Sequence, residues 1–189
     1  MDSIIPDAAA QPPLRSLLVV GGARSGKSRY AQKLAEASGK TPVLIATASA
    51  GDAEMAERIE KHRAERSAHW RVVEEEIDLT GALAREAAAD RVIVVDCLTL
   101  WLSNLMCAAK DTETAAERLA ARLAHIEGPV IFVSNEVGLG IVPDTRLGRA
   151  FRDAQGRLNQ LLGAACDAVV FVAAGLPLQL KPNAVALRL

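Results

Sequence analysis

Residues 17–28 read Leu-Leu-Val-Val-Gly-Gly-Ala-Arg-Ser-Gly-Lys-Ser, an apolar run followed directly by a glycine-rich loop. The last eight residues match the phosphate-loop pattern G-x-x-x-x-G-K-[ST] at every fixed position. Gly21 and Gly26 let the backbone turn tightly and bring its N–H groups close to phosphate oxygens, because no Cβ intervenes. We expect Lys27 to reach the β- and γ-phosphates and the Ser28 hydroxyl to bind Mg²⁺. The motif predicts a nucleoside triphosphate site formed by Gly21, Gly22, Ala23, Arg24, Ser25, Gly26, Lys27 and Ser28.

Further short runs rich in Val and Ile alternate with segments of helical periodicity. The runs lie at 42–46, 92–95, 130–133 and 168–173, and the helical segments at 28–38, 52–66, 79–88, 112–126 and 145–165. Such uninterrupted hydrophobicity is typical of strands buried on both faces of a parallel sheet. The alternation predicts a single-domain α/β fold, a P-loop (RecA-like) doubly wound, mostly parallel sheet with helices on both faces. Shorter segments after Gly175 favour an antiparallel edge.

Length and composition bound the remaining possibilities. A chain of 189 residues with 50% hydrophobic and 3% aromatic residues suits one domain with an aliphatic core. We expect a flexible tail over residues 1–14, without the features of a secretory signal, and a P-loop nucleotide-binding catalytic domain over 15–189. The formal net charge of −1 disfavours a broad basic surface for nucleic acid. No run approaches the ~20 apolar residues of a membrane helix, and we predict a cytoplasmic protein.

The three cysteines, Cys97, Cys107 and Cys166, are widely spaced and form no C-x-x-C pair. This spacing disfavours a zinc site. We interpret all three as buried, reduced thiols.

Asp96 follows the apolar run 92–95 directly. In open α/β sheets, ligands bind at the carboxyl ends of the strands, so a carboxylate at this position is suited to the magnesium side of a bound triphosphate. An aspartate here could also cap the helix that follows. Both roles remain open, and Ser28 and Asp96 are the predicted metal ligands.

Several longer motifs accompany the phosphate loop. They are Arg29-Tyr-Ala31, Ile45-Ala-Thr-Ala48, Arg58-Ile-x-x-His62-x-x-x-Arg66-x-x-x-Trp70, the run 95–105, the run 134–143 and Phe151-Arg-Asp-x-x-Gly156-x-x-Asn159. With these motifs, residues 17–181 resemble the bifunctional adenosylcobinamide kinase/adenosylcobinamide-phosphate guanylyltransferase family of cobalamin biosynthesis.

The resemblance implies two reactions. ATP or GTP phosphorylates adenosylcobinamide, and GTP then donates GMP to the phosphate through a guanylylated histidine, giving adenosylcobinamide-GDP and pyrophosphate. The matching histidine is His62, and Lys27 is the other implied catalytic residue. The resemblance also implies small-molecule substrates, Mg²⁺ and a homotrimer. Its nucleotide site adds Ala46, Thr47, Ala48, Arg63, Ala64, Glu65, Arg66 and Glu74 to the phosphate loop and Asp96.

The surroundings of His62 admit two interpretations. Lys61, Arg63 and Arg66 could form an ordinary solvated helix face with Glu/Arg pairs four residues apart. The same cations would discourage protonation of an imidazole nucleophile and offset charge on phosphates. His125 is explained by a position near a helix C-terminus, and His69 has no reactive neighbour in the sequence.

Two other functions remain open. The chain could be a P-loop small-molecule kinase without guanylyl transfer, or a nucleotide-binding regulatory module with slow hydrolysis. The polar segment 134–143 follows the fourth strand and could contact substrate or form a rigid connection. The phosphate loop suits attack at the γ-phosphate, whereas guanylyl transfer requires His62 to attack the α-phosphate. Either GTP changes its position between the two steps, or the 52–66 segment brings His62 to the α-phosphate of the same bound GTP.

Overall fold

The computed structural model describes residues 14–48 and 69–182. Seven strands form one sheet in the order β3-β2-β4-β5-β1-β6-β7, and every neighbouring pair is parallel except β6–β7. The strands are β1 (Ser16–Gly21), β2 (Thr41–Ala46), β3 (Arg71–Glu74), β4 (Arg91–Asp96), β5 (Val130–Asn135), β6 (Ala168–Ala173) and β7 (Leu176–Lys181). The predicted α/β sheet and its antiparallel edge are confirmed.

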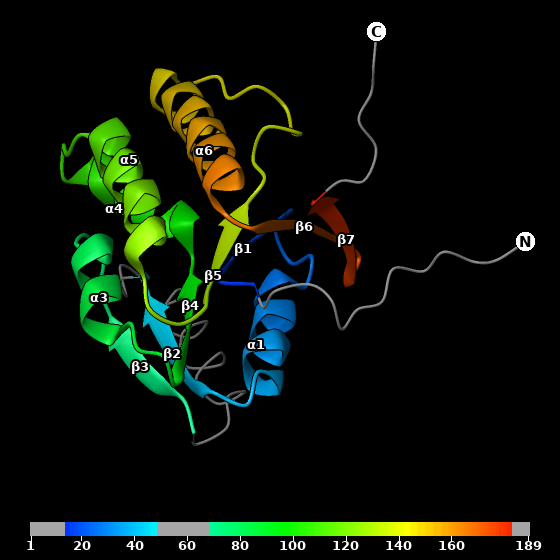
Figure 1. Cartoon of the computed structure of the whole chain (residues 1–189). Coiled ribbons are helices and arrows are strands. Elements are labelled where there is room, and N and C mark those ends of the chain that lie inside the picture. The colour runs from blue at the N-terminus through cyan, green and yellow to red at the C-terminus, as the bar shows by residue number, and fades with distance from the viewer. Residues whose placement is uncertain (1–13, 49–68, 183–189) are drawn as a thin grey trace, which may run out of the picture.

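Helices cover both faces of this sheet, as Figure 1 shows. In the described residues they are α1 (Lys27–Ala37), α3 (Leu79–Glu86), α4 (Leu98–Cys107), α5 (Thr112–Arg122), the 3₁₀ helix η2 (Leu123–His125) and α6 (Arg146–Ala165). Helix α1 lies on one face, and α3 to α6 lie on the other. The predicted doubly wound arrangement is therefore confirmed.

The strands alternate between two cores, as the pleat requires. On β1, Leu17 and Val19 pack with Ala31 and Ala35 of α1, whereas Leu18 and Val20 belong to the larger core beneath α3 to α6. The other central strands show the same alternation. Since both sets are buried, the strands read as continuous apolar runs in the sequence.

Helix α4 is an element that the periodicity did not indicate. Its sequence, residues 98–107, is apolar on several sides, and five of its residues are buried: Leu98, Thr99, Trp101, Leu102 and Leu105. A helix that is apolar over most of its surface shows little amphipathic period. It also follows the apolar strand β4 after one residue, Cys97, so the boundary is hard to see in the sequence.

The prediction for the cysteines needs correction, and two predicted segments lie outside the described residues. Cys107 is exposed at the end of α4, contrary to the prediction of three buried thiols, while Cys97 and Cys166 are buried. The predicted helix 52–66 lies outside the described residues, as does the predicted tail except for Leu14. Within the described part of the chain, no helix is long and apolar enough to cross a membrane.

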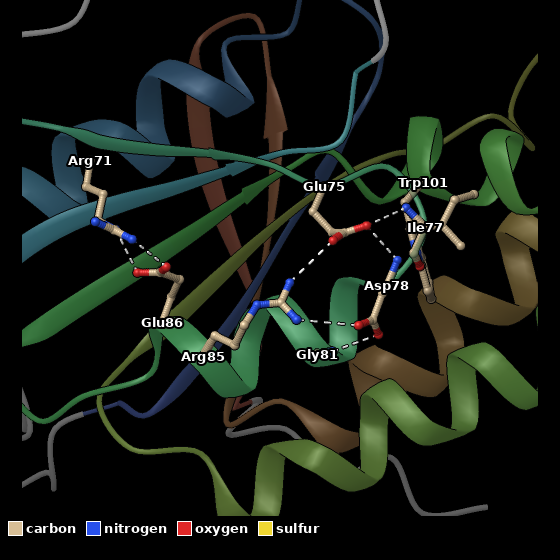
Figure 2. A network of polar contacts seen from close by, with 8 residues as sticks. All are labelled: Arg71, Glu75, Ile77, Asp78, Gly81, Arg85, Glu86 and Trp101. Atoms are coloured by element: carbon tan, nitrogen blue, oxygen red, sulfur yellow. Dashed lines mark hydrogen bonds and ion pairs between the residues drawn. The ribbon is translucent and has the colours of Figure 1, made fainter.

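A polar network joins the edge strand β3 to helix α3, and Figure 2 shows its members. Arg71 binds the Glu86 carboxylate through two hydrogen bonds of 2.8 and 2.9 Å. Glu75 accepts hydrogen bonds from the backbone N–H groups of Ile77 and Asp78, at 3.1 and 2.8 Å. Glu75 therefore orders the turn before α3.

Candidate nucleotide-binding site

The phosphate loop connects β1 to α1 and lies close to the β6–β7 turn. A Cβ on Gly21 would lie 2.3 Å from the carbonyl oxygen of Val172, and a Cβ on Gly26 would lie 3.2 Å from the Cα of Gly175. Gly26 has φ +99°, which disfavours any residue with a side chain. Close packing therefore requires the glycine at position 21, whereas the backbone conformation requires the glycine at position 26.

The N-terminus of α1 differs from those of α3, α5 and α6. Side chains of Asp78, Asp111 and Thr145 cap those three helices. Gly26 is the N-cap of α1, where no side chain of the described residues forms a capping hydrogen bond. The first turn of α1 also contains no acidic residue. Its N–H groups and the positive end of the helix dipole thus suit an anion.

Lys27 lies against the loop that precedes it. Its side chain is buried, and its Nζ donates a 2.6 Å hydrogen bond to the carbonyl of Gly22. The ammonium group is therefore already placed at the loop, where a triphosphate would bind. The Ser25 hydroxyl is buried and has no hydrogen-bond partner among the described residues. Buried hydroxyl groups are usually hydrogen-bonded, and a phosphate oxygen could accept a hydrogen bond from this one.

Asp96 ends β4 at the same edge of the sheet. Strand β5 separates β4 from β1, so the two strands lie roughly 10 Å apart at ordinary strand spacing. Val92 and Val94 pack on the α1 face, so alternation places Asp96 on that face too. The suggested helix-capping role is wrong, because the N-cap of α4 is Cys97.

Ser28 and Asp96 offer oxygen ligands of the type that Mg²⁺ prefers. Ser28 is the second residue of α1, and both residues are half-buried. The described residues contain no cluster of three or more His, Cys, Asp or Glu side chains that could hold a metal ion by themselves. This donor set fits Mg²⁺, which commonly takes one or two protein ligands and receives the others from phosphates and water.

Thr47 joins the ends of β2 and β4. Its hydroxyl is fully buried, donates to the carbonyl of Cys97 at 2.7 Å and accepts from the Cys97 N–H at 2.9 Å. Asn104 of α4 donates to the Thr47 carbonyl at 2.8 Å. The Thr47 side chain therefore orders the backbone of the site edge, while Ala46 and Ala48 beside it are half-buried.

The structure brings only part of the predicted site together. The phosphate loop, residues 46–48 and Asp96 lie along one edge of the sheet, and Glu74 is exposed at the end of β3, in register with Ala46. The predicted residues His62, Arg63, Ala64, Glu65 and Arg66 lie outside the described residues.

Sequence reasoning did not single out Asn135, the last residue of β5. It lies within the segment 134–143, and its signal is a polar residue directly after a buried strand. Residues 138–142 of this segment are exposed.

The comparisons with known proteins agree with this arrangement. The family model described as cobinamide kinase / cobinamide phosphate guanyltransferase matches residues 17–180. The bifunctional adenosylcobalamin biosynthesis protein CobP of Pseudomonas aeruginosa is 49% identical over 166 residues, covering 87% of this chain and 96% of that protein. The corresponding protein CobU of Salmonella typhimurium is 41% identical over 182 residues, covering 87% of this chain and 99% of that protein.

Among solved structures, an ATPase from the type III secretion system of pathogenic bacteria has a TM-score of 0.52 and 10% sequence identity. The match covers 87% of this chain and 56% of that chain, and it concerns the fold alone. This likeness agrees with the predicted P-loop type of α/β sheet. The family match extends over most of the chain, including the loop, Asp96 and the polar segment that follows β5. The chain therefore belongs to the cobinamide kinase / cobinamide phosphate guanyltransferase family of cobalamin-biosynthesis enzymes.

Proposed function

We propose that this chain phosphorylates the aminopropanol hydroxyl of adenosylcobinamide with ATP or GTP and then converts the phosphate to adenosylcobinamide-GDP with GTP. The observation that carries the proposal is the phosphate loop with its buried Lys27, at one sheet edge with Asp96, in a chain of this family. Such an edge suits a triphosphate whose γ-phosphate faces a small-molecule acceptor.

In the kinase step, the substrate hydroxyl oxygen attacks the γ-phosphorus. The bond from this phosphorus to the β,γ-bridging oxygen breaks, the nucleoside diphosphate leaves with the electron pair, and the hydroxyl proton passes to water. Lys27 and the N-terminus of α1 stabilise negative charge on the phosphates. Ser28 and Asp96 would hold Mg²⁺, which when bound neutralises charge on the β- and γ-phosphate oxygens.

In the guanylyl step, the neutral imidazole of His62 attacks the α-phosphorus of GTP and pyrophosphate leaves. A P–N bond forms, and the imidazole proton is lost. A phosphate oxygen of adenosylcobinamide phosphate then attacks the same phosphorus, the P–N bond breaks and the imidazole regains a proton. Support for this assignment comes from the family motif and from the cations Lys61, Arg63 and Arg66 in the sequence around His62.

GTP labelled at its α-phosphate tests the relay directly. After incubation, denaturation and electrophoresis, we expect label on the wild-type chain and none on His62→Ala. His69→Ala, which removes an exposed histidine of the described region, is the matched control and should label normally. A phosphoramidate is labile in mild acid and persists in alkali, because protonation of its nitrogen creates a good leaving group. An acid-stable label, or a label on His62→Ala, would contradict the histidine relay.

The same experiments separate the two other functions. A kinase without guanylyl transfer would phosphorylate adenosylcobinamide but never retain the guanosine moiety. A regulatory nucleotide-binding module would transfer nothing to a small molecule and would retain its product. Under our proposal, His62→Ala still phosphorylates adenosylcobinamide when ATP is supplied, because γ-transfer needs no imidazole. Equal loss of both activities in a folded His62→Ala protein would place His62 in general nucleotide binding.

The proposal includes a cytoplasmic homotrimer that acts on small molecules and not on nucleic acid. A corrin is large for a small-molecule substrate, so a surface shared between subunits would suit it. Light scattering coupled to size-exclusion chromatography measures the assembly, and a mass of one chain would contradict the trimer.

A further inference from the structure

Asn135 lies at the centre of the site edge, between the two strands that carry the phosphate loop and Asp96. Its strand, β5, is hydrogen-bonded to β1 on one side and to β4 on the other. Asn135 is in register with Gly21, the first residue of the loop, and Val133 is in register with Asp96. The strand order therefore inserts a carboxamide between a loop suited to phosphates and a carboxylate suited to their metal ion.

Alternation along β5 places Asn135 on the face that carries α1. Ile131 and Val133 pack in the core beneath α1, whereas Phe132 packs in the opposite core. Ser134 also faces away from α1, because its hydroxyl donates a 2.6 Å hydrogen bond to Oδ1 of Asn159 on α6. Asn135 thus shares a face with Asp96 and with the helix that begins at Lys27.

Side chains from two helices hold the backbone of Asn135. Thr99 of α4 accepts a 2.9 Å hydrogen bond from the Asn135 N–H, and Asn159 of α6 donates a 3.1 Å hydrogen bond to the Asn135 carbonyl. Gln155, which is fully buried, donates to the Ser134 hydroxyl at 2.9 Å and to Asn159 Oδ1 at 3.1 Å.

Side chains of Thr99 and Asn159 thus satisfy the backbone N–H and carbonyl of Asn135. The carboxamide of Asn135 is therefore not needed to satisfy these two groups. Hydrogen bonds of this kind around a residue hold its side chain in a fixed position, as is typical of functional residues.

The next residue ties this strand end to the phosphate loop. The N–H of Glu136 donates a 3.0 Å hydrogen bond to the carbonyl of Gly21. Asn135 is itself half-buried, so a ligand at the edge can reach its side chain. This hydrogen bond resists movement of the phosphate loop relative to the end of β5, where Asn135 lies.

We propose that Asn135 is a further catalytic residue, whose Nδ2 donates a hydrogen bond to a γ-phosphate oxygen of the bound triphosphate. The inference deepens the proposed kinase function and rests on it. During γ-transfer, charge is spread over the equatorial phosphate oxygens, and a preorganised donor at that position stabilises it. A nucleoside diphosphate lacks this group, so Asn135 also distinguishes the triphosphate from the diphosphate.

Binding measurements with two nucleotides test the assignment. For Asn135→Ala, we expect the affinity for a β,γ-imido triphosphate to fall roughly 10- to 100-fold, the usual effect of losing a hydrogen bond to a charged group. Affinity for ADP should stay unchanged. Asn135→Asp keeps the size of the side chain but brings a like charge to the phosphate, so its loss of triphosphate affinity should be larger. Gln160→Ala, which removes an exposed carboxamide next to Asn159, should bind both nucleotides normally.

The ratio of the two affinities decides the outcome. If Asn135→Ala loses affinity for both nucleotides equally, or for neither, the assignment is overturned and Asn135 only shapes the strand end. If this variant fails to fold by circular dichroism, Asn135→Asp decides by the same ratio. These measurements need no adenosylcobinamide. A wild-type protein that discriminates triphosphate through Asn135 but does not phosphorylate adenosylcobinamide would refute the proposed function and leave the γ-phosphate contact standing.

Discussion

The backbone N–H of Gly175 donates a 2.8 Å hydrogen bond to the carbonyl of Ser25, which lies 150 residues earlier in the chain. Through this bond the turn between β6 and β7 supports the phosphate loop. The Cα of Gly175 also lies where a Cβ on Gly26 would approach it to 3.2 Å. The antiparallel edge of the sheet therefore restrains the backbone of the phosphate loop.

The contact between the loop and β6 predicts different effects of two neighbouring substitutions. Gly21→Ala would place a methyl group 2.3 Å from the backbone oxygen of Val172, and neither group can move without disturbing the sheet. We expect a loss of about 1–3 kcal/mol in the free energy of unfolding, together with weaker triphosphate binding. Urea denaturation and calorimetric titration measure the two effects.

Gly22→Ala is the matched control. Apart from its two chain neighbours, no described residue has an atom within 4 Å of a Cβ on Gly22, and the φ of Gly22 lies outside the left-handed region. Stability should change by less than about 0.5 kcal/mol, as for an ordinary surface substitution. Equal destabilisation by the two substitutions would contradict the packing argument.

Lys27→Ala should reduce both activities together. Its ammonium group lies against the phosphate loop, and removing a preorganised cation at transferring phosphates costs on the order of 10²-fold or more in rate. Kinase and guanylyl-transfer rates should be measured alongside circular dichroism. Lys33→Ala, an exposed lysine of the same helix, should leave both rates unchanged. A folded Lys27→Ala protein with either rate near the wild-type value would assign that step to a different triphosphate site.

Glu86 should contribute stability that depends on pH. The hydrogen bonds from Arg71 lower the pKa of Glu86 below its usual 4.5, against the opposing effect of burial, and the charges of Arg71 and Arg91 lower it further. A carboxylate whose folded pKa is lowered stabilises the protein above its unfolded pKa, and this stabilisation is lost as pH falls through the folded value. We expect Glu86→Gln to cost about 1 kcal/mol at pH 7, because Arg71 is largely exposed to solvent.

Urea denaturation between pH 7 and pH 3 checks this expectation. The difference in unfolding free energy between wild type and Glu86→Gln should shrink as the solution becomes more acidic than pH 4.5. Glu117→Gln, on an exposed position of α5, should show no comparable difference. A gap between wild type and Glu86→Gln that stays constant over this range would show that the ion pair does not drive the effect.

Thiol reagents should distinguish Cys107 from the other two cysteines. Burial, together with the nearby charge of Asp96, raises the pKa of Cys97 to about 11. Burial likewise raises the pKa of Cys166 to about 12. Because the thiolate is the reactive form, native protein at pH 8 should be alkylated at exposed Cys107 alone. Mass spectrometry after brief iodoacetamide treatment measures this, and denatured protein should be labelled at all three positions. Native labelling of Cys107→Ser would contradict it.

The phosphate loop and most of the strands and helices could be predicted from the sequence because they depend on local chemistry. A glycine-rich loop after a buried strand carries its own signal, and so does a carboxylate that directly follows residues 92–95. Helix α4 could not be predicted in this way, since its residues face apolar neighbours on several sides. The role of Glu75 was also hidden, because its partners are backbone groups whose positions depend on the turn.

The amino-acid sequence alone predicted a triphosphate site and indicated the family of the chain, since residues 21–28 and the longer motifs are contiguous in the chain. Which strands are neighbours in the sheet became visible in the folded chain. Strand β5 lies between β1 and β4, although it follows both in the sequence, and this order places Asn135 on the strand between those that end at Gly21 and Asp96. Strand order depends on how the helices pack on the two faces of the sheet. The hydrophobic periodicity of a segment indicates that a strand is buried, but it does not indicate which strand lies beside it.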